Sequence, residues 1–288
     1  MFRLAPACIG LTIATCVCSN ALAVVTNARL YRLGEDDGGC LPSPGKDPTL
    51  ERVANVNASK RGLAFYHGSS PSTSLGLAPG STCSMEFTNT DSRYVAPAFM
   101  SPAENFGLEA YLEISPVGAD ARAFHNGDSG FPTGPLSRGY GIGTSGGFYV
   151  AFVGSSVFAT AKPATAGKAV QMALVNTGGT HFEVYVDRSL VLSFSSAVPP
   201  IAPSDVISIG NFVSNLNPPA FSGVVDEARV FTFAPGAFDP NVDLGAARAA
   251  SPVPALRSRD LILLVLLLVS VAIWLGKRRR PSVRKESV

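Results

Sequence analysis

Short runs in which apolar and polar residues alternate, each ended by a turn signal, recur through the middle of this chain. In residues 181–194, Phe182, Val184 and Val186 occupy every second position, and polar or amphipathic residues lie between them. A turn at residues 187–189 leads into a second run with the same alternation. Because successive side chains of a strand point to opposite faces, this pattern predicts a hairpin with one buried face.

The same signal recurs in shorter segments, and no long stretch shows helical periodicity. Further strand candidates are residues 62–66, 84–87, 107–114, 139–142, 147–153, 171–175, 206–209 and 223–231. Many short strands joined by Gly- and Pro-rich turns are typical of β-sandwiches rather than of parallel α/β sheets. We therefore predict one all-β domain over residues 24–233, a two-sheet antiparallel jelly-roll sandwich. Residues 234–256, rich in Ala, Pro and Asp, are expected to form a linker.

The chain begins with the pattern of a secretory signal peptide over residues 1–23. Arg3 supplies a positive start, an apolar stretch follows, and Ala21 and Ala23 form the small-x-small motif that signal peptidase reads. We predict a short signal helix that is removed on export. Two alternatives stay open: a membrane-spanning helix, for which the apolar stretch is short, and lipidation at Cys16, where the preceding residue fits a lipoprotein motif poorly.

A second apolar segment lies near the C-terminus. Residues 261–276 are apolar apart from one Ser, and at about 1.5 Å per residue a helix of this length reaches roughly 24 Å, slightly less than the hydrocarbon core of a bilayer. The residues that follow directly are Lys277, Arg278, Arg279 and Arg280. Since such clusters stay on the cytoplasmic side, residues 257–288 are expected to form a transmembrane helix with a basic stop-transfer tail, which leaves the domain outside the inner membrane.

Charge separates the ends of the chain from its middle. The whole chain carries 23 Lys and Arg against 21 Asp and Glu, a formal net charge of +2. Residues 24–256 hold 14 Lys and Arg against 19 Asp and Glu, so the exported part has a net charge of −5. A nucleic-acid-binding protein needs a basic face to neutralise phosphates, and this acidic domain therefore argues against such a partner.

Cysteine usage agrees with an exported domain. Three of the five cysteines lie within residues 1–23, which leaves Cys40 and Cys83. An even number in an oxidising compartment favours a disulfide, whose closed loop of about 43 residues would stabilise the fold by roughly 3–4 kcal/mol. A zinc site is the alternative, but it needs further ligands, and no histidine lies close to either cysteine in sequence.

Four fragments, in the same order along the chain, resemble the LamG-like, concanavalin A-type jelly roll. They are residues 30–36 (LYRLGED), 106–111 (FGLEAY), 182–187 (FEVYVD), and 209–210 with 221–231 (IG and FSGVVDEARVF). Tyr111 stands where the family usually has Trp, and Arg188 replaces the glycine usual after the third fragment. The resemblance covers residues 24–233 and implies a fold that the family uses for carbohydrate binding and for glycoside hydrolysis.

The C-terminal segment carries a second resemblance. Val253, Pro254, Ala255 and Leu256, followed by an apolar helix and an Arg cluster, resemble the IPTL-CTERM variant of the PEP-CTERM sorting signals, with two departures from Ile-Pro-Thr-Leu. The resemblance implies an exosortase-type membrane protease of a Gram-negative bacterium as partner. We therefore expect the protein at the cell envelope, the cell surface or the extracellular matrix. An ordinary single-pass anchor is the alternative.

Paired carboxylates matter because related folds include glycoside hydrolases. Glu109 and Glu113 share one face of a predicted strand, and four residues of strand separate them by roughly 13 Å. Glycosidases place their two carboxyl groups about 5–9.5 Å apart, so this pair is too far apart. Asp226 and Glu227 are adjacent, and we expect Glu227 to pair with Arg229 and Asp226 to be buried or to lie at a β-bulge, with ligand binding as the alternative.

An acidic turn is the candidate for a metal site. Glu35, Asp36 and Asp37 precede two glycines and offer carboxylate and carbonyl oxygens to Ca²⁺, although they lack the alternating spacing of an EF-hand loop. A solvated acidic turn is the alternative. The three histidines are far apart in sequence, and their order matches no Ser/His/Asp arrangement.

These features favour a non-enzymatic protein with no cofactor, Ca²⁺ being the one ion that the sequence offers a site for. We expect an exported bacterial surface or matrix protein whose jelly roll binds carbohydrate or another protein through loops at one rim. The expected partners are the membrane, signal peptidase, an exosortase-type protease and a polysaccharide. A structural coat component without a small ligand and a carbohydrate-active enzyme are the alternatives.

Overall fold

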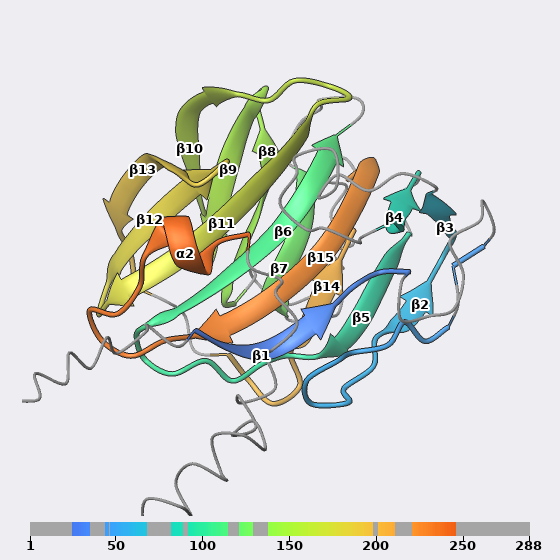
Figure 1. Ribbon diagram of the computed structural model, residues 1–288, viewed down its shortest axis with the longest axis horizontal. Coiled ribbons are helices and arrows are strands. Elements are labelled where there is room, and N and C mark those ends of the chain that lie inside the picture. The colour runs from blue at the N-terminus through green and yellow to red at the C-terminus, as the bar shows by residue number, and fades with distance from the viewer. Residues whose placement is uncertain are drawn as a thin grey trace, which may run out of the picture.

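The computed structural model describes residues 25–34, 44–45, 47–67, 82–88, 92–114, 121–128, 138–197, 201–210 and 221–245. These residues form two antiparallel β-sheets packed face to face (Figure 1). The predicted all-β jelly-roll sandwich is therefore confirmed. Among the described residues, no helix is both long and apolar enough to cross a membrane.

Several predicted features lie outside the described residues and stay predictions. They are the signal helix of residues 1–23 with Ala21 and Ala23, the acidic turn of Glu35, Asp36 and Asp37, the cysteine Cys40, the sorting motif of Val253, Pro254, Ala255 and Leu256, and the helix and tail of residues 257–288 with Lys277, Arg278, Arg279 and Arg280.

The first sheet carries the site described below. Within the described part of the chain it has eight strands in the order β13-β12-β11-β6-β15-β4-β3, with β1 also paired to β15. Their bounds are β1 Thr26–Tyr31, β3 Ala64–His67, β4 Ser84–Phe87, β6 Phe106–Ile114, β11 Ala169–Gly178, β12 His181–Val186, β13 Ser189–Ser195 and β15 Gly223–Thr232. The central strands β6, β11 and β15 are the longest of this sheet, and almost all of their residues are buried.

The second sheet closes the other side of the core. Its strands, counted over the residues that the structure describes, number seven and run β10-β9-β8-β7-β14-β5-β2. Their bounds are β2 Ser59–Arg61, β5 Arg93–Pro97, β7 Ala121–Asp128, β8 Tyr140–Ser145, β9 Phe148–Val153, β10 Ser156–Pro163 and β14 Val206–Ile209. The main core lies between the sheets and is built mainly from the inward-facing residues of the longer strands.

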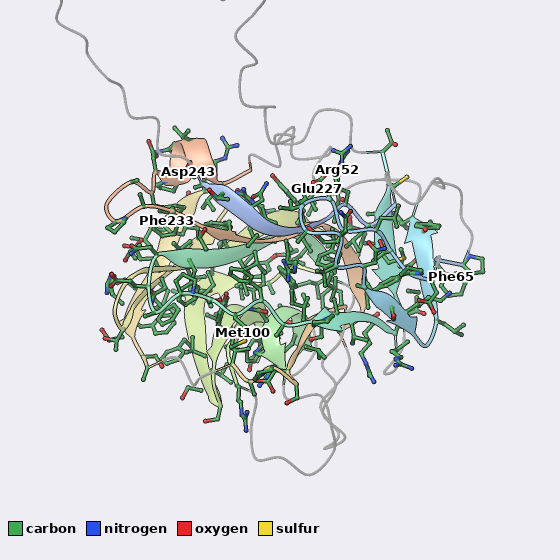
Figure 2. All side chains as sticks on the ribbon, turned by 90° about the horizontal axis from the view of Figure 1, so that it is seen from below. Arg52, Phe65, Met100, Glu227, Phe233 and Asp243 are labelled. Atoms are coloured by element: carbon green, nitrogen blue, oxygen red, sulfur yellow. The ribbon has the colours of Figure 1, made fainter. Side chains whose placement is uncertain are left out.

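The outer face of the first sheet is also covered over part of its area. Residues 233–245, which we call the strap, cross this face after β15 and contain the short helix α2, Pro240–Asp243 (Figure 1). Phe233 and Leu244 of the strap pack with Ala173 and Val175 of β11 in a second apolar cluster. Figure 2 places Phe233 and Asp243 beside α2 on this side of the sandwich.

The strap differs from the linker predicted for this part of the chain. Phe233 and Leu244 are buried and Phe238 is half-buried because they have partners in the outer face of the sheet, which sequence composition does not reveal. Asp239 caps α2 by accepting a hydrogen bond from Asn241 N at 2.9 Å, and Pro240 occupies the first turn. An Asp followed by Pro is a helix-start signal, so the described part of the predicted linker has local order of its own.

The predicted hairpin is present at β12 and β13. Phe182, Val184 and Val186 all point into the main core, as the alternation predicts. Asp187 and Arg188 at the turn have positive φ angles of 52° and 62°, as a type I′ turn requires. Arg188 therefore adopts a conformation that glycine usually supplies at this position.

Five strands were not predicted: β1, β2, β5, β7 and β10. Two of them, β2 and β10, are the edge strands of the second sheet. β2 consists of three polar residues, and most residues of β10 are exposed or half-buried. An edge strand can form on backbone hydrogen bonds alone, and it then lacks the hydrophobic alternation from which strands are predicted.

Candidate functional site

A pocket opens between the strap and the adjoining ends of β11 and β12. Its volume is about 330 Å³. The residues that line it are Thr177, Glu183, Tyr185, Phe233, Gly236, Phe238 and Pro240. Strands supply one wall and the strap supplies the other, so the pocket exists because the strap folds back over the sheet.

The strand wall follows from the alternation along β12. Phe182 and Val184 point into the core, so Glu183 and Tyr185 must point to the outer face. Thr177 lies near the end of β11, beside the β11–β12 turn. The outward-facing residues of β12 thus form part of the strand wall of the pocket.

The strap wall depends on a turn between two phenylalanines. Ala237 N donates to Ala234 O at 3.0 Å, and Gly236 within this turn has a φ of 69°. A side chain would strain the backbone at this angle, so glycine lets the chain reverse direction here. The reversal brings Phe233 and Phe238 to within 5.1 Å, measured between ring centroids.

Aromatic rings form the apolar part of the pocket. The rings of Tyr185 and Phe238 meet at 5.8 Å with an interplanar angle of 62°, and Phe238 also lies 6.3 Å from Phe231. Phe238 is thus the ring that joins the strap to the strand wall. A cluster of this kind is rigid, because each ring fixes the orientation of the next.

One carboxylate forms the polar part of the pocket. The Tyr185 hydroxyl donates to Glu183 Oε2 at 2.6 Å, and His181 Nε2 lies 3.6 Å from Glu183 Oε1. The Glu183 side chain is 21% exposed. Burial raises the pKa of Tyr185, and its hydrogen bond to Glu183 adds to this shift, so the phenol keeps its proton and remains a donor at neutral pH.

A second set of charged groups lies on the same outer face, nearer the middle of the sheet. Arg229 of β15 donates to Glu109 Oε2 of β6 from Nε at 2.7 Å and from its terminal nitrogen at 2.5 Å. Both side chains are almost fully buried, 2% and 1% exposed. The guanidinium also lies 4.7 Å from the ring of Phe231, a cation–π distance.

The end of the strap closes over this ion pair. Glu109 Oε1 accepts from Gly245 N at 2.7 Å and from the Gln171 side chain. Arg229 donates to Asn27 Oδ1 at 3.0 Å and to the backbone carbonyl of Asp243. Backbone and side-chain partners surround both charges, so the Glu109–Arg229 pair holds the strap to the sheet and offers no opening to a ligand.

The Glu227–Arg229 ion pair predicted from the sequence is wrong. A β-bulge lies between Asp226 and Arg229, and Glu227 within it has a φ of 48°. The bulge shifts the alternation of side chains, so Arg229 meets Glu109 and Glu227 instead binds Arg32, with Nε and Oε1 2.9 Å apart. The prediction that Asp226 is buried or lies at a bulge is confirmed, since it is fully buried at this bulge.

The other candidate residues are separated in space. Glu109 and Glu113 share the outer face of β6 as expected, but only Glu109 is buried in the charged cluster, whereas Glu113 is half-buried beyond it. Cys83 is buried next to β4; its predicted partner Cys40 lies outside the described residues, so the disulfide stays a prediction. The described residues contain no group of three or more His, Cys, Asp or Glu placed to hold a metal.

The alternation in residues 181–194 predicts the outward position of Glu183 and Tyr185 but no role for them, and no pattern predicts the strap wall. The missing information was that residues 233–245 return to the sheet. Phe233 and Phe238, together with the Asp239–Pro240 helix start, were the available signal, because large aromatic residues are uncommon in a solvated linker.

Solved structures of two proteins share this fold. Domain 4 of AbnA, a GH43 extracellular arabinanase from Geobacillus stearothermophilus in complex with arabinotriose, has a TM-score of 0.52 and 14% identity, over 75% of this chain and 96% of that domain. The binding domain of Paraclostridial Mosquitocidal Protein 1 has a TM-score of 0.51 and 11% identity. This alignment covers 75% of this chain and 50% of that one.

The remaining comparisons concern sequence. No curated protein matches this chain. A family model described as the concanavalin A-like lectin/glucanases superfamily matches residues 87–237, which run from the end of β4 to the middle of the strap and include five of the seven pocket residues. The match covers more than half of the 288 residues. The chain therefore belongs to the concanavalin A-like lectin/glucanases superfamily.

Proposed function

We propose that this protein is an exported, non-catalytic glycan-binding module of the bacterial cell envelope, and that the pocket under the strap is its glycan site. The observation that carries the proposal is the pairing of aromatic rings with one partly exposed carboxylate in a pocket of about 330 Å³. Sugars present flat C–H faces and projecting hydroxyls, and rings and carboxylates are the groups that contact these two features.

The geometry assigns a role to each wall. Phe238 and Phe233 supply apolar surface for the face of a sugar ring, and Tyr185 stays fixed by its hydrogen bond to Glu183. The Glu183 carboxylate, which already accepts a hydrogen bond from Tyr185, has further lone pairs that accept hydrogen bonds from sugar hydroxyls. The pocket lies at the small end of the roughly 300–1,000 Å³ range of ligand pockets, so it suits a chain end or a short segment of glycan.

Membership of the superfamily supports a carbohydrate ligand, as does the arabinotriose complex of the structurally similar arabinanase domain. The sequence patterns of the two ends support export and a membrane-proximal position. We propose that signal peptidase removes residues 1–23 and that an exosortase-type protease of a Gram-negative bacterium reads the motif at residues 253–256. Binding then takes place at the cell surface or in its matrix.

Glycan binding to the full-length protein in detergent tests the proposal. We expect binding to a subset of oligosaccharides on a glycan array, and we expect Phe238→Ala to weaken it by about 5- to 30-fold, because losing one aromatic platform removes on the order of 1–2 kcal/mol. Phe148→Ala is the matched control, since Phe148 is a partly exposed ring on β9 of the other sheet.

Three results would contradict the proposal. If Phe148→Ala abolishes binding and Phe238→Ala does not, the glycan site lies elsewhere on the domain. Self-assembly of the protein without binding to any glycan supports a structural coat component instead. Turnover of a bound polysaccharide identifies an enzyme.

A further inference from the structure

The pocket has a pronounced charge asymmetry. Of its seven lining residues, all of them described, Glu183 alone carries a carboxyl group. Its carboxylate is 21% exposed and is not closed over by the strap. No lysine or arginine lines this pocket within the described residues, so a ligand meets one negative charge framed by rings.

Two further carboxylates among the described residues lie near the pocket and strengthen this asymmetry. Glu104 accepts from Gly179 N at 3.0 Å and thus places a second carboxylate at the β11–β12 turn. Asp239 follows directly after the pocket residue Phe238 and carries the carboxylate that caps α2. His181 contacts Glu183 from outside the pocket lining and is 47% exposed.

Aromatic rings next to a carboxylate recognise cations. A ring face attracts an ammonium group through its quadrupole, and a partly desolvated carboxylate adds a charge-assisted hydrogen bond. Phe233, Phe238 and Tyr185 provide the rings, and Glu183 provides the carboxylate. A neutral sugar would use the rings and leave this charge facing the ligand without a counter-charge.

We propose that the pocket selects a glycan residue that carries a free, protonated amine, such as a de-N-acetylated amino sugar. This inference rests on the proposed glycan-binding function and adds the charge of the ligand to it. The ammonium group contacts Glu183, and the C–H face of the same sugar ring packs against Phe238. A uronic acid is rejected, because its carboxylate would meet that of Glu183 in a partly dehydrated space.

Calorimetry on the full-length protein in detergent, at a pH where the sugar amine is protonated, tests the inference. The probes are three oligomers of equal length: glucosamine, N-acetylglucosamine and galacturonic acid. We expect the glucosamine oligomer to bind at least about tenfold more tightly than the N-acetylated one, since a hydrogen bond between two charged groups is stronger than one between neutral groups. We expect the galacturonate oligomer to show no binding.

Variants assign the preference to one side chain. Glu183→Gln keeps an acceptor for the Tyr185 hydroxyl and removes the charge, so it should reduce the preference for glucosamine over N-acetylglucosamine to about twofold or less. Glu113→Gln is the matched control, because Glu113 is a half-buried carboxylate on the same face of the sheet but lies outside the pocket lining. It should leave the preference unchanged, and circular dichroism confirms that both variants are folded.

The outcomes separate this inference from the proposal on which it rests. Equal binding of the amine and the N-acetylated oligomer, or a preference that survives Glu183→Gln, overturns the charge selection and leaves the glycan site standing. Binding of galacturonate in preference to glucosamine overturns it as well. If no array glycan and none of the three oligomers binds, the proposed function itself fails.

Discussion

Glu109 and Glu183 are two carboxylates on the outer face of the same sheet, and the same strap lies next to both. Glu109 is 1% exposed and shares its oxygens among Arg229, Gln171 and the backbone of Gly245. Glu183 is 21% exposed and has the Tyr185 hydroxyl and the imidazole of His181 as its described polar partners. One carboxylate is closed in and the other opens to a pocket.

The difference between them teaches that residue type and strand position do not separate a structural charge from a binding charge. Both glutamates occupy outward positions of strands in which inward and outward residues alternate. Both also precede a tyrosine by two positions, Tyr111 and Tyr185 respectively. What separates them is their contact with the strap, whose end donates a hydrogen bond to Glu109 but which leaves a pocket beside Glu183.

The largest effect is expected from breaking the closed cluster. Glu109→Gln removes the carboxylate that accepts two hydrogen bonds from the buried guanidinium of Arg229, which should lower the free energy of unfolding by about 3–5 kcal/mol. Urea denaturation at neutral pH measures it. Glu113→Gln, four residues further along β6, should change stability by less than about 0.5 kcal/mol.

A double variant sharpens the interpretation of that loss. Glu109→Leu combined with Arg229→Met removes both charges and should recover most of the stability, because the cost comes from the unpaired ion rather than from a missing attraction. If Glu109→Gln is as stable as the wild type, the cluster does not hold the strap, and the contrast between the two carboxylates fails.

An intermediate effect is expected in the open pocket. Tyr185→Phe removes the hydrogen bond to Glu183, and because this carboxylate reaches water the loss of stability should stay at or below about 1 kcal/mol. The same denaturation experiment measures it. A loss as large as that of Glu109→Gln would show that Glu183 is a structural charge after all.

The smallest effect concerns the strap itself and depends on pH. Burial raises the pKa of Asp243 above its ordinary value of 3.8, against the opposing influence of the hydrogen bond from Asp239 N and of Arg229. The folded chain therefore takes up this proton at a higher pH than the unfolded chain, so the contribution of Asp243 to stability improves as pH falls through the raised pKa towards 3.8.

Asp243→Asn removes that contribution. The stability of the variant relative to wild type should be higher at neutral pH than at about pH 4. Thermal unfolding of both proteins across this pH range measures the difference. A difference that is constant with pH, or that has the opposite slope, contradicts the raised pKa and with it the burial of Asp243 within the strap.

Sequence alone was sufficient for the sandwich and for its best strands. The alternation around Phe182 and Val184 predicted the hairpin because a half-buried strand must separate its two faces by residue type. The alternation pattern is absent from β2, which has three polar residues at a sheet edge, and this strand was therefore not predicted. Strands held by backbone pairing alone leave no mark in the order of residue types.

The candidate site was less predictable for a different reason. Glu183 and Tyr185 could be assigned to the outer face, but the second wall comes from residues about fifty positions later, which were expected to be a linker. The bulge at Glu227 also reversed the expected partner of Arg229, because one extra residue in a strand exchanges its two faces. Both failures concern long-range geometry, to which a local pattern is insensitive.

The anchoring of the strap has a mechanical consequence. Tension applied to the chain beyond residue 245 reaches the domain first at the contacts of Gly245 with Glu109 and of Asp243 with Arg229. These partners lie on β6 and β15, adjacent strands inside the sheet rather than at its edge, so the load is shared by two strands that are themselves flanked on both sides. A domain tethered by its C-terminus would therefore resist detachment of its strands under load. The pocket wall formed by Phe233 and Phe238 would keep its shape until the contacts of the strap with Glu109 and Arg229 break.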